Sequence, residues 1–187
     1  GNDSAGSMLR ETLELEGIDT SQLITVDAPT GRAFITVDSK GENTIVIVPG
    51  ANSYVVAASF TLPSASVVLA QLEIPLATVI HVFTQARHSD AITVLNPAPA
   101  AQLSDTLLAM CDIVVPNETE SEALGGTTQL LHAGAITVIT TLGARGAEIT
   151  DANSTVSIAP TQVRAIDTVG AGDAFVGALC AELSRGQ

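Results

Sequence analysis

The chain has 187 residues, which suits one domain with a small additional element, and 46% of them are apolar, enough for a sizeable core. Its formal net charge of -13 argues against nucleic acid and against an anionic membrane surface as partners. No signal-peptide pattern and no apolar run long enough to span a membrane is found. Cys111 and Cys180 lie far apart in apolar surroundings, so we expect no disulfide framework and a reducing, cytoplasmic location.

The first part of the chain predicts a helix, a strand and a hairpin. Apolar spacing over 8–15 indicates a helix that ends near Gly17, and a short strand is expected at 23–26. Two β-rich runs, 33–37 and 44–48, are joined by a polar segment without a helical pattern between them, and they predict a hairpin. A hairpin inside an α/β chain favours a flap beside a site, although an ordinary surface hairpin fits the pattern equally well.

From residue 66 onward, apolar β-rich runs alternate with helical patterns. Buried strands are expected at 66–72, 91–95, 112–116 and 136–140, short edge strands at 147–149 and 155–158, and helices at 75–86 and 103–110. The segment 125–135 is too short for the helix that should cover the sheet at that point. This order predicts an α/β fold with a doubly wound, mainly parallel sheet flanked by helices.

Polar or glycine-rich segments follow the predicted strands, where ligands bind in open α/β sheets. They are Glu73, the loop 96–100 with its two prolines, the cluster 117–120 and the glycine loop 141–146. Three of them have an ordinary structural interpretation as well. Glu73 can be a solvated or capping group, 117–120 can be a helix capping box, and 141–146 can be a simple turn.

The most informative stretch is Asp167-Thr168-Val169-Gly170-Ala171-Gly172-Asp173-Ala174-Phe175, which runs into a helical pattern. Small residues at 170–172 let the backbone turn tightly and approach a ligand. The N-terminus of the following helix suits an anion, phosphate above all. Asp173 would repel a phosphate, so we interpret it as a base for a hydroxyl that attacks that phosphate. A helix cap is the alternative interpretation of this aspartate.

This string closely resembles the C-terminal signature of the ribokinase (PfkB) family of carbohydrate kinases. The resemblance implies phosphoryl transfer from ATP to a sugar hydroxyl, with Asp173 as the base and Gly170, Ala171 and Gly172 as the anion hole. It implies that Asn117 and Glu120 help to place Mg²⁺, indirectly through water, together with the phosphates.

The resemblance also implies binding roles for further residues. The nucleotide site would comprise Asn117, Thr141, Leu142, Gly143, Ala144, Arg145, Gly146, Gly172 and Asp173. Glu73 and Asp173 would contact the sugar, and Asp167 and Val169 would hold K⁺. The hairpin, at about 30–50, would be a lid over the sugar whose strands could pair across a homodimer.

Glu73 and the segment Asn96-Pro97-Ala98-Pro99 resemble the ribokinase members of the family more than other members. We therefore expect D-ribose to be phosphorylated at its primary hydroxyl. The alternatives are another kinase of the family, acting on fructose, adenosine or a phosphosugar, and a non-catalytic sugar- or nucleotide-binding relative. The non-catalytic alternative is disfavoured by the presence together of Asp173, Gly170, Gly172, Asn117 and Glu120.

The single ribokinase-like domain, residues 1–187, is expected to be incomplete at both ends. The first strand and the N-terminal sugar-binding motif of the family are missing, and so are the contacts that follow the last helix. The chain is also short after Asn52 and after Gly125, so we expect interruptions of the chain path within 52–66 and 125–135.

Overall fold

The structure is a computed structural model that describes residues 1–37, 43–57, 61–166 and 168–186. The chain forms two compact units: residues 1–61 with 73–78, and residues 62–72 with 79–187.

The first unit contains helix α1 (Ser4–Leu15), strands β1 (Arg32–Val37) and β2 (Asn43–Val48), and the short 3₁₀ helix η1 (Gly50–Tyr54). Helix α1 confirms the predicted helix. The strand predicted at 23–26 is wrong, because this segment is irregular. Its backbone groups bond locally instead of to a partner strand: the Leu23 N–H donates to the Thr20 carbonyl, and the Leu23 carbonyl accepts from Arg10.

Strands β1 and β2 form the predicted hairpin, with Arg32 opposite Val48 and Phe34 opposite Val46. Residues 38–42 of the predicted connection lie outside the described residues. The base of the hairpin is held by Gly50, whose φ of +51° places the position of a Cβ only 2.4 Å from the Pro29 carbonyl oxygen. Only glycine fits there without moving the backbone.

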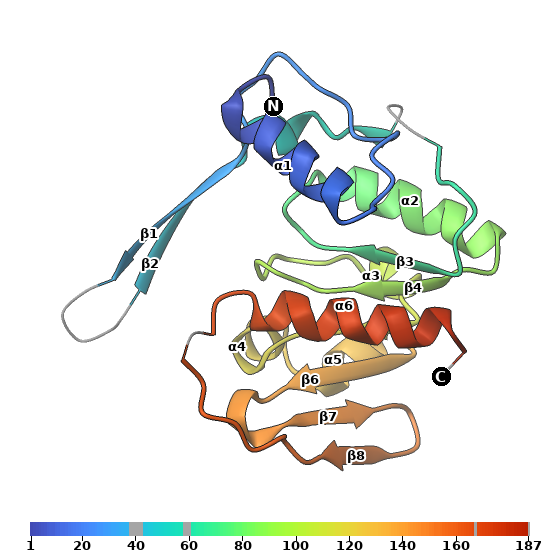
Figure 1. Cartoon of the computed structure of the whole chain (residues 1–187). Helices are drawn as coiled ribbons and strands as arrows, with labels where there is room; N and C mark the ends of the chain where they lie inside the picture. Colours follow the sequence, from blue (N-terminus) through green and yellow to red (C-terminus); the bar gives the residue numbers. More distant parts are fainter. Residues whose placement is uncertain (38–42, 58–60, 167, 187) are drawn as a thin grey trace. The chain divides into compact units, whose positions relative to one another are not determined.

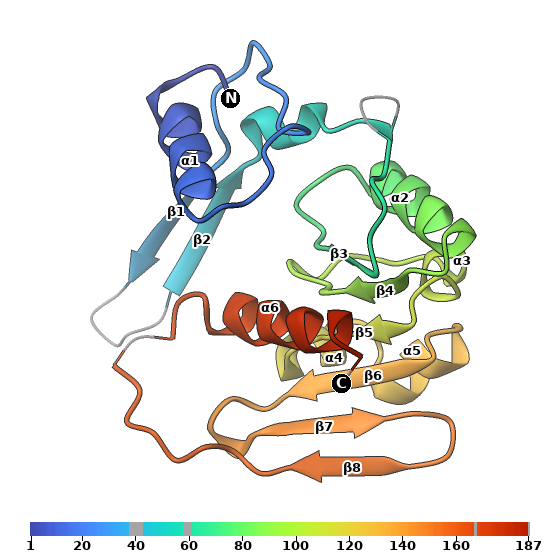
Figure 2. The ribbon, with the colours of Figure 1, turned by 45° about the vertical axis from the view of Figure 1, so that its right-hand side comes forward.

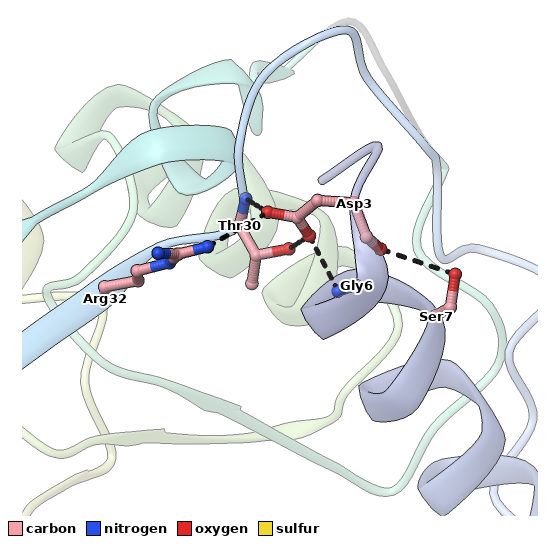
Figure 3. Close-up of polar contacts among 5 residues, drawn as sticks. All are labelled: Asp3, Gly6, Ser7, Thr30 and Arg32. Carbon is pink, nitrogen blue, oxygen red and sulfur yellow. Dashed lines mark hydrogen bonds and ion pairs between the residues drawn. The ribbon is translucent and has the colours of Figure 1, made fainter.

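Asp3 connects the start of α1 to the segment that leads into β1 (Figure 3). Its Oδ1 accepts from the Gly6 N–H at 2.9 Å and from the Thr30 hydroxyl at 2.5 Å, and its Oδ2 accepts from the Thr30 N–H at 2.9 Å. Arg32 completes the cluster with an ion pair at 3.7 Å. These donors, the Thr30 hydroxyl first, lower the pKa of Asp3 to about 2 because they stabilise the ionised carboxylate.

The second unit is built on one six-stranded sheet. Its strands, in spatial order, are β3 (Val67–Ala70), β4 (Ile92–Leu95), β5 (Ile113–Val114), β6 (Thr137–Thr141), β7 (Ala147–Thr150) and β8 (Thr155–Ile158). Strands β3 to β6 are parallel, and β7 and β8 continue the sheet in antiparallel pairing. The predicted α/β fold with a mainly parallel sheet is confirmed.

Helices cover both faces of this sheet. They are α2 (Leu76–His88), α3 (Asp105–Leu108), α4 (Glu118–Ala123), α5 (Thr127–His132) and α6 (Ala171–Ser184). Helix α6 crosses the front of the sheet, and α5 lies behind β6 (Figures 1 and 2). On the α6 side, Val94, Val115 and Ile139 form a core cluster with Val176 of the helix. Among the described residues, no helix is long and apolar enough to cross a membrane.

Helix α5 occupies the segment that we judged too short for a covering helix. Its six residues pack against β6, with Leu130 buried. Backbone hydrogen bonds continue through 125–135, so the interruption expected there is not found. Of the other expected interruption, within 52–66, residues 58–60 lie outside the described residues.

Candidate active site

The carboxyl ends of the four parallel strands bring polar side chains to one edge of the sheet. Gln71 follows β3, Asn96 follows β4, Asn117 lies just beyond β5, and Thr141 ends β6. Asn117 and Thr141 also face each other in a parallel bridge. This edge and the start of α6 enclose a pocket of about 140 Å³. The pocket brings together the following predicted site residues: Asn117, Glu120, Thr141, Gly170, Gly172 and Asp173.

The start of α6 has the geometry expected of a tight turn before a helix. Gly170 is the N-cap and has a φ of +73°, which favours glycine. The Ala171 N–H donates to the Thr168 carbonyl at 3.2 Å, so this group of the predicted anion hole is engaged within the turn. A Cβ at Gly172 would meet no described atom within 4 Å. Protein packing therefore does not require glycine at 172, whereas close approach of a ligand would.

Asp173 lies in the first turn of α6 and is exposed. Within the described part of the chain, no side-chain hydrogen bond caps the start of this helix, so the interpretation of Asp173 as a hydrogen-bonding cap is not supported. Its carboxylate Oδ1 instead accepts a hydrogen bond from Gln71 Nε2 at 3.0 Å. The side chain is thereby directed to the carboxyl edge of the sheet, where it lines the pocket.

Asn117 and Glu120 form a complete capping box at the start of α4. Asn117 Oδ1 accepts from the Glu120 N–H, and Glu120 Oε2 accepts from the Asn117 N–H, both at 2.8 Å. The structural interpretation of these residues is therefore correct. It leaves Asn117 Nδ2 and Glu120 Oε1 without a hydrogen bond to any described residue, and both residues line the pocket.

The glycine loop after β6, residues 141–146, has a mainly structural role. Of its residues, Thr141 lines the pocket. The Leu142 N–H donates to the Gly146 carbonyl at 2.8 Å, and a Cβ at Gly146 would come within 2.0 Å of the Ile158 carbonyl oxygen. Arg145 forms an ion pair with Glu118, and this contact raises the pKa of Arg145. The loop is thus tied to β8 and to α4.

Comparison with known proteins agrees with this geometry. The family model "pfkB family carbohydrate kinase" matches residues 1–187. The chain belongs to the pfkB family. The ribokinase of Staphylococcus aureus (strain COL) is 40% identical over 205 residues, with 100% of this chain and 67% of that protein aligned.

Solved structures give the same result. Ribokinase from Thermotoga maritima superposes with a TM-score of 0.88 at 35% identity and covers 100% of this chain and 66% of its own. Ribokinase from Arabidopsis thaliana, complexed with ribose and ATP, superposes with a TM-score of 0.79 at 25% identity, covering 100% of this chain and 68% of its own. The chain thus spans about two thirds of the length of these pfkB relatives.

Further residues to which the pfkB resemblance gives a role do not line this pocket, among them Ala171 and residues 142–146. Glu73 is exposed and belongs to the first compact unit. Asp167 lies outside the described residues. Val169 precedes the N-cap of α6 and does not line the pocket.

Gln71 and Asn96 are the site residues that sequence reasoning missed. The amino-acid sequence places Gln71 in the predicted strand 66–72 and Asn96 in the loop 96–100, without a role for either side chain. Each is the first residue after a strand of the parallel sheet, and those strands are neighbours. That position, at the carboxyl end of parallel strands, was the signal that could have identified them.

The residues of the pocket suit a Mg²⁺ ion that takes most of its ligands from water and substrate phosphates. Among the described residues, no group of three or more His, Cys, Asp or Glu could hold a metal ion. Glu120 and Asp173 nevertheless line one pocket, and two carboxylates there would repel a polyphosphate. Mg²⁺ commonly binds through one or two carboxylates plus water and substrate phosphates, so this sparse donor set suits it.

Proposed function

We propose that this chain carries the catalytic site of an ATP-dependent sugar kinase that phosphorylates D-ribose at its primary hydroxyl. The observation that carries the proposal is the single pocket that joins the Asp173 carboxylate, the glycine turn of α6, and Asn117 with Glu120. It is supported by the membership of the chain in the pfkB family and by the ribokinases among its relatives, one of them complexed with ribose and ATP.

The chemistry follows from the residues of the pocket. Asp173 accepts the proton of the sugar hydroxyl as that oxygen forms a bond to the γ-phosphorus of ATP and the bond to the ADP oxygen breaks. The start of α6, with the open space beside Gly172, stabilises the negative charge of the transferring group. Glu120, with Asn117, would hold Mg²⁺ through water, and the ion would neutralise charge on the nucleotide phosphates.

The proposal extends to parts of the protein that the resemblance alone indicates. Glu73 contacts the sugar, the loop 141–146 contributes to the nucleotide site, and the β1–β2 hairpin serves as a lid that pairs in a homodimer. K⁺ binds at Asp167 and Val169 and orders the neighbouring turn. Cys111 and Cys180 are both free thiols, which agrees with a cytoplasmic protein.

The test is an assay of ATP consumption by the full-length protein with a panel of pentoses, hexoses and nucleosides. We expect D-ribose to give the highest kcat/KM, with ribose 5-phosphate as product, and the rate to rise when K⁺ replaces Na⁺ at fixed ionic strength. A preference for fructose, adenosine or a phosphosugar would favour another kinase of the family. Sugar or nucleotide binding without turnover would favour the non-catalytic alternative.

A further inference from the structure

We propose that Gln71 is a positioning residue for Asp173, acting through a chain of side-chain amides that is anchored on the backbone carbonyl of Val115, the residue after β5. The proposal rests on the proposed function, because it assigns Asp173 the role of base. Three hydrogen bonds carry it: Asn96 Nδ2 to the Val115 carbonyl at 2.8 Å, Gln71 Nε2 to Asn96 Oδ1 at 2.9 Å, and Gln71 Nε2 to Asp173 Oδ1 at 3.0 Å.

The backbone on both sides of Gln71 is fixed by the neighbouring strand. The Asn96 N–H donates to the Ala70 carbonyl at 3.0 Å, and the Leu72 N–H donates to the Ala98 carbonyl at 3.0 Å. Gln71 therefore sits between two hydrogen bonds that continue the β3–β4 pairing beyond the strands. Its side chain leaves a rigid backbone, which lowers the entropic cost of holding it in one orientation.

The direction of every bond in the chain is determined by chemistry. Asn96 is 8% exposed, and its Nδ2 must donate, because the Val115 carbonyl can only accept. Its Oδ1 therefore faces Gln71 as an acceptor, and an ionised Asp173 is also an acceptor. Gln71 can satisfy both only through Nε2, which carries two hydrogens. Flipping the Gln71 amide would place its oxygen against two acceptors.

This arrangement orients the carboxylate of Asp173 for proton transfer. Gln71 holds Oδ1, and within the described residues no other side chain donates to this carboxylate. Oδ2 is thus left to the acceptor hydroxyl. Because Asp173 is exposed, its side chain would rotate freely without Gln71. Misplacement of a catalytic group by about 1 Å can reduce the rate by roughly 100-fold.

The deciding experiment measures kcat and KM of Gln71→Met in the wild-type protein and in the Asp173→Asn background. Met keeps the length of the side chain but removes the donor. In the wild-type protein we expect kcat to fall by roughly 10- to 100-fold, with KM for ATP and the melting temperature nearly unchanged. In the Asp173→Asn background we expect no further fall, because the carboxylate that Gln71 positions is already gone. Gln102→Met, at an exposed position before α3, is the matched control and should leave kcat unchanged.

An unchanged kcat in Gln71→Met would overturn the inference. So would the same fold-loss in both backgrounds, because it would mean that Gln71 acts independently of the Asp173 carboxylate. If the wild-type protein phosphorylates no sugar, the proposed function fails, and the contact is then judged by the ¹³C NMR resonance of the Asp173 carboxylate. We expect Gln71→Met to shift that resonance and Gln102→Met to leave it in place. The absence of a shift in Gln71→Met would overturn the inference.

Discussion

Gln71 Nε2 lies 3.0 Å from Asp173 Oδ1, although 102 positions separate the two residues in the chain. The bond connects the end of β3 to the first turn of α6, and α6 also packs against β3. The contact thus joins the first strand and the last helix of the second unit within the site. The following substitutions are chosen so that an effect on catalytic rate can be distinguished from an effect on protein stability.

Asp173→Asn tests the base directly. The variant keeps the size of the side chain but cannot accept the proton, so kcat should fall by roughly 10²–10⁴-fold. Affinity for ATP should stay the same or rise, because a negative charge beside the phosphates has been removed. Asp105→Asn, which changes an aspartate in the first turn of α3, is the control and should leave kcat unchanged. A near-wild-type kcat for Asp173→Asn would show that this residue is not the base.

Gly172→Ala should raise the stability of the protein and lower its catalytic activity. A Cβ at 172 meets no described atom within 4 Å, and alanine favours a helix over glycine by about 0.5–1 kcal/mol. The same methyl group would occupy the space that the phosphate needs, so kcat/KM should fall about tenfold or more. Gly177→Ala, in the exposed middle of α6, should give the stability gain alone. Equal activity of the two variants in steady-state assays would contradict close ligand approach at 172.

Glu120→Gln separates capping from magnesium binding. Glutamine also serves in a capping box, so the melting temperature should hardly change. The lost charge should raise the Mg²⁺ concentration needed for half-maximal rate by several fold, since Mg²⁺ favours carboxylate oxygens. Glu122→Gln, on the same helix and exposed, controls for net charge. If Mg²⁺ titrations of Glu120→Gln and wild type coincide, Glu120 is only a cap.

The loss of stability caused by Asp3→Asn should depend on pH. The pKa of Asp3 is lowered from 3.8 to about 2 in the folded protein, so its contribution is present above pH 3.8 and is lost as the pH falls through about 2. The variant should thus unfold at lower urea concentration than wild type at pH 6. The difference should shrink progressively on acidification. Glu11→Gln, on the exposed face of α1, removes a charge from the same helix without touching the Asp3 contacts and is the control. A pH-independent difference would mean that the Thr30 contacts do not depend on charge.

Cys111 should be chemically silent in the folded protein. Burial, followed by the charge of Asp112, raises the pKa of its thiol to about 12, and its side chain is fully buried. Because the thiolate is the reactive form, a thiol reagent at pH 8 should modify Cys180 first and reach Cys111 only after unfolding. Mass spectrometry of the labelled peptides distinguishes the two sites. Rapid labelling of Cys111 under native conditions would contradict this burial.

Local patterns in the amino-acid sequence were sufficient to predict much of the fold of this protein. The apolar runs that form β3, β4 and β6 predicted the parallel sheet, and the glycine turn at Gly170 predicted the start of α6. Both predictions succeeded because hydrophobic periodicity and the left-handed backbone conformation of glycine depend only on neighbouring residues. The strand predicted at 23–26 failed for the complementary reason. A strand needs a partner, and its backbone groups found turns and Arg10 instead.

Tertiary structure alone decided how the polar residues at the strand ends act together. By sequence, Gln71 and Asn96 were only members of strand-end segments, and Asp173 was either a base or a cap. The parallel register of β3 and β4 places the two amides within hydrogen-bond distance, and the path of α6 across the sheet brings the carboxylate to them. Such contacts depend on the relative placement of elements that are distant in the chain, so no local pattern encodes them.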